Sequence, residues 1–144
     1  MKIWFDMDGT IADLYGVEGW LEMLIAHDAT PYAVAKPLVN LAVLARLMNK
    51  AQRNGFEICV VTALAKDSTA DYDERVKTAK IKWLAKHLKS VQFDEIRFVP
   101  YWFTKNDVNE GNDILFDDEE RHLVKWTGKA VPANKMIETL KAIA

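Results

Sequence analysis

The stretch Ile3-Trp-Phe-Asp-Met-Asp-Gly-Thr-Ile-Ala-Asp13 decides how the rest of the chain is interpreted. Residues 2–5, just before the first aspartate, form a short and mainly apolar run. A continuous run of this length is typical of a strand that helices bury on both faces. Gly9 permits the tight turn that is needed if the chain leaves the sheet here. Asp6 and Asp8 are therefore predicted to lie at the carboxyl end of a buried strand.

Further apolar runs alternate with longer helical patterns along the chain. The other strand candidates are residues 58–61, 95–99, 113–116 and 129–131. Apolar residues at helical spacing predict helices over residues 37–53, beginning at Pro37, over 75–88 and 119–126, and from Asn134 to residue 143. Such alternation predicts an α/β fold, a Rossmann-like three-layer sandwich with a parallel sheet of about five strands.

The chain has the length and composition of one ordinary domain. Its 144 residues are 50% hydrophobic and carry a formal net charge of -2, so the total charge does not indicate a nucleic-acid or membrane binder. We expect a single domain over residues 1–144, in which residues 14–36 form a small helical cap inserted after the first strand.

The sequence also bears on the compartment. Cys59 is the only cysteine, which excludes an internal disulfide, and it is expected to be buried in a strand. Asp6 interrupts the N-terminal apolar run too early for a signal peptide, and the longest mostly apolar stretch, residues 37–48, is too short to span a bilayer. We therefore expect a soluble, cytoplasmic protein without a membrane partner.

A second acidic pair, Asp117-Asp118, follows the predicted strand at residues 113–116. Taken alone, each pair has a simpler interpretation: Asp6 and Asp8 suit a solvated turn, and the second pair suits an acidic helix N-terminus. If the two strands are neighbours, however, all four carboxylates converge at one edge of the sheet. A cluster of oxygen donors favours Mg²⁺ over zinc or copper.

At these positions the sequence resembles the haloacid dehalogenase superfamily of phosphatases, and the resemblance extends over nearly the whole chain. The four motifs of that superfamily fall on Asp6-Met-Asp-Gly-Thr10, Val60-Val-Thr62, Lys105 and Asp117-Asp118. The resemblance implies a Mg²⁺-dependent enzyme that hydrolyses phosphate monoesters. An aspartate at position 8 favours such a hydrolase over the transport ATPases of the same superfamily.

The resemblance also implies a role for each carboxylate. Asp6 is expected to attack phosphorus and to form an aspartyl phosphate that water later hydrolyses. Asp8 is expected to protonate the leaving oxygen and then to activate that water. The metal ligands that the resemblance implies are Asp6, Asp8 through its backbone carbonyl, Asp117, and Asp118 beside the ion or at the rim.

The residues that the resemblance implies for binding the phosphate are Gly9, Thr10, Thr62, Ala63 and Lys105. Thr62 would donate a hydrogen bond to a phosphate oxygen, although a threonine at a strand end also caps the segment that follows. Lys105 would neutralise negative charge at the reaction centre, although an exposed loop lysine is the simpler interpretation. Lys66 is too close to Thr62 in the chain for this role. Lys80 and Lys82 are expected on the helix before the third strand.

Within the superfamily, 5'(3')-deoxyribonucleotidase-like proteins and the phosphatase domain of polynucleotide kinases are most similar around Thr62, Trp83 and Asp117-Asp118. This similarity makes a nucleotide the expected substrate. The cap of this chain is shorter than that of the deoxyribonucleotidases, which implies an open site. A polynucleotide end, another small phosphorylated metabolite, transfer to an acceptor other than water, and an inactive metal- or phosphate-binding module stay open as alternatives.

Aromatic side chains fall into two groups. Trp20 and residues 101–103 lie near predicted rim loops, where they would either stack on a base or simply pack. Trp4 and Trp83 are expected in the core, because one lies in the first strand and the other on the apolar side of a helix.

Overall fold

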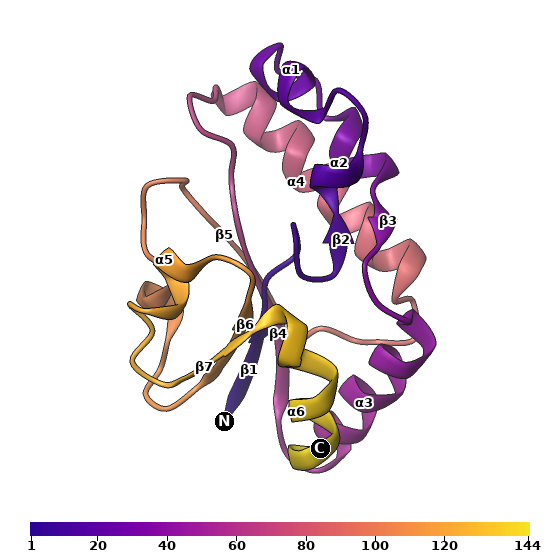
Figure 1. The fold of residues 1–144 in the computed structure, drawn as a ribbon, viewed down its shortest axis with the longest axis vertical. Helices are drawn as coiled ribbons and strands as arrows, with labels where there is room; N and C mark the ends of the chain where they lie inside the picture. Colours follow the sequence, from indigo (N-terminus) through magenta and orange to yellow (C-terminus); the bar gives the residue numbers. More distant parts are fainter.

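A five-stranded parallel sheet forms the centre of the protein, described here for all 144 residues from a computed structural model. The strands are β1 (Lys2–Phe5), β4 (Glu57–Ala63), β5 (Glu95–Val99), β6 (Ile114–Asp117) and β7 (Lys129–Pro132), in the spatial order β5-β4-β1-β6-β7 (Figure 1). Central β1 pairs with β4 and β6, so that Trp4 lies level with Cys59 and Leu115. The predicted α/β sandwich is therefore confirmed, and Cys59 is buried as predicted.

Helices cover the two faces of the sheet unequally. The long helices α3 (Leu41–Arg53), α4 (Ala70–His87) and α6 (Met136–Ile143) lie on one side in Figure 1. The other side carries only the short turns η2 (Lys105–Val108) and α5 (Glu120–Leu123) with their connecting loops. The third short turn, η3 (Ala133–Lys135), leads from β7 into α6.

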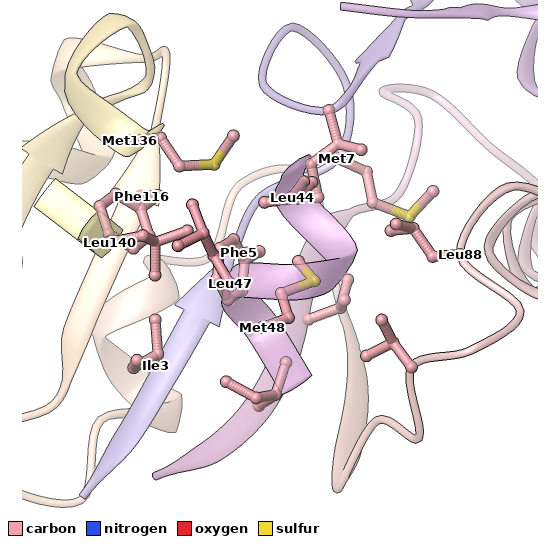
Figure 2. Close-up of a cluster of buried hydrophobic side chains, with 14 of the residues drawn as sticks. Ile3, Phe5, Met7, Leu44, Leu47, Met48, Leu88, Phe116, Met136 and Leu140 are labelled. Carbon is pink, nitrogen blue, oxygen red and sulfur yellow. The ribbon is translucent and has the colours of Figure 1, made fainter. Parts of the chain in front are cut away.

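Alternate residues of β1 enter different clusters, which fixes the strand in the sheet. Ile3 and Phe5 belong to the large cluster beneath α3 and α6, whereas Trp4 belongs to the smaller cluster on the opposite face. Figure 2 shows Phe5 beside Leu47 and Phe116, and the Phe5 and Phe116 rings lie 5.2 Å apart. A shift of β1 by one residue would exchange its faces, so packing fixes the position where the strand ends and the site begins.

The insertion after the first strand is a small cap. The two-residue strands β2 (Ala12–Asp13) and β3 (Lys36–Pro37) pair antiparallel at its base. Between them lie η1 (Leu14–Gly16), α1 (Trp20–Ile25) and α2 (Thr30–Val34). Leu14 and Tyr32 of this cap pack on Tyr72 and Val76 of α4, so the cap is attached to the longest helix of the fold.

Two predicted helix starts were wrong. Pro37 does not begin a helix but ends β3, and α3 starts at Leu41, where the Asn40 side chain accepts a hydrogen bond from the Val43 N–H. The next helix begins at Ala70 instead of residue 75, because the Thr69 hydroxyl caps it by accepting from the Tyr72 N–H. In both cases a polar capping side chain sets the boundary.

The last two helices are also shorter than predicted. The helix expected over residues 119–126 is the single turn α5. Asn134 does not cap the final helix: it lies inside η3, and α6 begins at Met136.

Candidate functional site

Three carboxylates meet where β1 and β6 end side by side. The Asp6 N–H donates to the Phe116 carbonyl at 2.9 Å, which extends the strand pairing to the first aspartate. Asp6, Asp117 and Asp118 each offer a carboxylate oxygen, and these oxygens lie within 4.8 Å of one another. The structure thus brings together three of the four acidic residues through side-chain oxygens, whereas the Asp8 carboxylate is held elsewhere.

The turn after β1 is shaped by Gly9 and Thr10. Gly9 has a φ of 86°, and a Cβ atom there would collide with the Asp118 carboxylate. The Thr10 hydroxyl donates to Asp6 Oδ2 at 2.8 Å. The Gly9 and Thr10 N–H groups donate to the carbonyls of Ala12 and Met7, so both are used inside the turn. These two residues position the aspartates; they line a separate hollow with Asp118 and not the cavity that Asp6 and Asp8 share.

Lys105 joins two of the carboxylates. It begins η2 and is only 2% exposed, so the interpretation as an exposed loop lysine was wrong. Its Nζ donates to Asp6 Oδ1 at 2.6 Å and to Asp117 Oδ2 at 2.7 Å. The other Asp117 oxygen accepts from the Glu119 N–H at 3.0 Å, which orients that carboxylate.

A second buried lysine, Lys80, lies at the site, and the sequence prediction had placed it only on a helix. It is 1% exposed and donates from Nζ to Thr62 Oγ1 at 2.6 Å, to Asp8 Oδ2 at 2.9 Å and to the Ala63 carbonyl at 2.9 Å. A signal for it exists in the sequence, because Lys80 follows Tyr72 and Val76 at intervals of four on the buried face of α4.

Of the other two lysines considered for the site, neither joins the acidic cluster. Lys66 lines the cavity, and its Nζ lies 5.0 Å from the centre of the Trp102 ring. Lys82 is exposed on α4.

Burial and neighbouring charges give the aspartates different acidities. Burial alone would raise the pKa of Asp6, but the Lys105 charge and hydrogen bonds that include one from Thr10 bring this pKa below its usual value. Burial raises the pKa of Asp8, and the Lys80 charge opposes that rise only in part. Burial together with the Asp6 charge lifts the pKa of Asp117 to about 6.

The pKa values of Asp118 and Lys105 are also shifted. Asp118 is exposed at the rim of the cluster, yet partial desolvation and its contact with the Asp6 carboxylate raise its pKa to about 8. Burial would lower the pKa of Lys105, but the charges of Asp6 and Asp117 raise it above its usual value, and its ammonium stays charged.

A cavity of about 290 Å³ opens beside this cluster. Asp6, Asp8, Ala63 and Lys105 lie on its wall, whereas Thr62, the residue before Ala63 in β4, is fully buried and does not line it. The cap supplies an apolar side that includes Tyr15 and Trp20, whose rings meet edge to face with centres 4.9 Å apart. Tyr101 and Arg121 line it from the other side. The cavity therefore joins a charged end to an aromatic one.

The expected aromatic residues divide between cavity, surface and core. Trp20 and Tyr101 line the cavity, but Trp102 and Phe103 are 70% and 57% exposed and lie outside it. Trp4 and Trp83 are buried in the core as predicted.

The donor set fits a hard divalent cation. The three carboxylates offer only oxygen ligands, the type that Mg²⁺ binds. The raised pKa values of Asp117 and Asp118 mark an excess of negative charge that such an ion would relieve. The Asp8 carboxylate is bound by Lys80, which leaves only its backbone carbonyl in the expected ligand set.

Comparison with known proteins adds no family to this description. No family model matches the chain, and a search of the curated proteins found no significant match. Among the helices, none has both the length and the apolar composition needed to cross a membrane.

Proposed function

We propose that this protein is a Mg²⁺-dependent phosphatase of the haloacid dehalogenase type, which hydrolyses phosphate monoesters through a phosphoryl group on Asp6. The observation that carries the proposal is that Asp6 and Asp8 line the same cavity with opposite shifts in pKa. An ionised carboxylate suits a nucleophile, and a neighbouring carboxyl group whose pKa is raised takes up a proton more readily, which suits a general acid.

The first half of the reaction would use both groups at once. An oxygen of Asp6 forms a bond to phosphorus while the bond from phosphorus to the leaving oxygen breaks. The leaving oxygen takes the proton of Asp8, so the alcohol departs neutral. Lys105 and Thr10 hold the two Asp6 oxygens at 2.6 and 2.8 Å, which fixes the direction of attack.

The second half would return the enzyme to its starting state. Water attacks phosphorus, gives a proton to the Asp8 carboxylate and releases inorganic phosphate from Asp6. When bound by Asp6, Asp117, Asp118 and the Asp8 carbonyl, Mg²⁺ would supply the positive charge that lets an anionic nucleophile approach an anionic phosphate.

The shape of the cavity favours a flat, partly apolar leaving group. Tyr15, Trp20 and Tyr101 place aromatic rings around a volume of about 290 Å³ beside the charged end. A nucleoside fits this combination, because a base has faces that stack and the cavity offers aromatic surface. We therefore propose a nucleoside monophosphate as the substrate class, with a polynucleotide end and a smaller phosphorylated metabolite as the competing outcomes of the test.

The test measures phosphate release in the presence of Mg²⁺ from nucleoside monophosphates, end-phosphorylated oligonucleotides and sugar phosphates. We expect the highest kcat/KM with nucleoside monophosphates and none with Asp6→Asn, whose amide keeps the shape of the side chain but is a poor nucleophile. A kcat/KM for sugar phosphates about tenfold above that for every nucleotide would contradict the proposed substrate class but not the phosphatase reaction. No release from any ester would contradict the phosphatase itself.

A further inference from the structure

Lys80 is a buried charged residue at the site that has no role in the proposed reaction steps. It extends from α4 to the point where the ends of β1 and β4 meet, and three protein oxygens surround its Nζ. Those oxygens accept all the hydrogen bonds that an ammonium can donate. Lys80 does not line the cavity, so it acts on a substrate only through its partners.

Its bond to Thr62 sets the direction of the Thr62 hydroxyl. A lysine ammonium can only donate, so Thr62 Oγ1 must accept at 2.6 Å. The single hydroxyl proton of Thr62 must then point away from Lys80. Thr62 is fully buried and does not line the cavity, so this bond ties the end of β4 to the same lysine that holds Asp8.

Its bond to Asp8 holds one carboxyl oxygen and leaves the other free. Nζ binds Asp8 Oδ2 at 2.9 Å, and the residue also lines the cavity. A side chain held in this way cannot rotate freely, and proton transfer to a leaving oxygen requires a hydrogen-bond distance to that oxygen. The same contact therefore determines where the Asp8 proton is presented.

Structural stability does not account for a charge at this position. Lys80 occupies the apolar stripe of α4 among Tyr72, Val76, Trp83 and Leu84, all buried. A well-packed apolar side chain at such a position is often at least as stabilising as a buried ion pair. The ring of Tyr32 from the cap, 4.9 Å from Nζ, closes off solvent and strengthens the interactions of the charge.

We infer that Lys80 is a positioning residue for phosphoryl transfer: anchored by Thr62 and the Ala63 carbonyl, it holds Asp8 in place as general acid. This inference rests on the proposed function. It concerns leaving-group departure above all, because an ester with a poor leaving group needs the Asp8 proton and one with a good leaving group does not.

The test compares Lys80→Met with the wild type on two substrates, 4-nitrophenyl phosphate and an alkyl phosphate such as a nucleoside monophosphate. The quantity to compare is kcat/KM, which ends at the first irreversible step and is unaffected by hydrolysis of the phosphoryl-enzyme. We expect kcat/KM to fall about 100-fold for the alkyl ester and less than about tenfold for the aryl ester, since general acid catalysis contributes about 10²–10⁴. Lys82→Met on the exposed face of the same helix should leave both values unchanged.

A second variant covers the case in which Lys80→Met does not fold. Lys80→Gln keeps a donor for Thr62 without the charge beside Asp8, and the same divergence between the esters is expected. An equal fall for both esters, or no fall, in a folded variant of an active enzyme would overturn the role of Lys80 alone. A wild type without activity on either ester would overturn the proposed function and this inference with it.

Discussion

Replacing Lys105 by methionine is expected to destabilise the folded protein strongly. Lys105→Met keeps the length of the side chain and removes an ammonium that is 2% exposed and bound to both Asp6 and Asp117. Breaking a buried ion pair on one side costs about 3–5 kcal/mol, because the remaining charge stays buried without a partner. For 144 residues, an unfolding entropy of about 0.3 kcal/mol/K converts this into a Tm lower by about 10–17 °C.

Thermal unfolding followed by circular dichroism, with a chelator at pH 8, measures the effect directly. Two conditions should reduce it. Mg²⁺ should raise the Tm of the variant more than that of the wild type, because a cation that binds only the folded state then replaces the missing charge. Lowering the pH to 5.5 should also reduce the difference, because the unpaired carboxylates take up protons.

Lys82→Met is the matched control, since that lysine is exposed on the surface of α4. It should unfold within about 2 °C of the wild type, as surface substitutions usually do. A Tm for Lys105→Met that equals the wild-type value at pH 8 without metal would refute the reasoning, because the two carboxylates would then not depend on the ammonium.

Two further effects follow from the same cluster. With a chelator, the Tm should fall as pH rises from about 4 to 8. The reason is that Asp118 and Asp117 have folded-state pKa values of about 8 and about 6, above the unfolded value, and lose their protons over that range. Asp118→Asn should flatten this dependence of Tm on pH, and an unchanged slope would contradict the raised pKa of Asp118. In urea unfolding, Gly9→Ala should lower the free energy of unfolding clearly more than Gly55→Ala. Both glycines have positive φ, but only a Cβ at position 9 would strike a side chain, that of Asp118. Equal losses would show that the close approach of Gly9 to Asp118 does not matter for stability.

The sheet was predictable because its strands are buried on both faces. Such strands appear in the sequence as unbroken apolar runs, and the predicted bounds 2–5 and 95–99 coincide with β1 and β5. The convergence of Asp6 with Asp117 required one further assumption, that their strands are neighbours, and the pairing of β1 with β6 meets it. The order of the strands alone therefore predicts that residues at the ends of adjacent parallel strands lie close together.

The parts that sequence reasoning missed depend on tertiary contacts. Pro37 is compatible with a helix start, but pairing with Ala12 in the base of the cap decides its conformation. A lysine on a helix is normally expected to face solvent, and only the packing of α4 against the site buries the Lys80 side chain. Lys105 was chosen by resemblance, yet its burial between two carboxylates could not be derived from a loop sequence.

The central claim is that Asp6 carries the phosphoryl group, and direct detection of that group tests it. Asp8→Asn mixed with 4-nitrophenyl phosphate and Mg²⁺, then quenched in acid, should accumulate a phosphoryl group, because the good leaving group departs without an acid and the water lacks its base. Mass spectrometry of the peptide that contains Asp6 should locate the group on that residue, and Asp6→Asn treated alike should carry none. Phosphate release by the wild type without any phosphoryl group on Asp6 in the trapped variant, or undiminished release by Asp6→Asn, would contradict the mechanism.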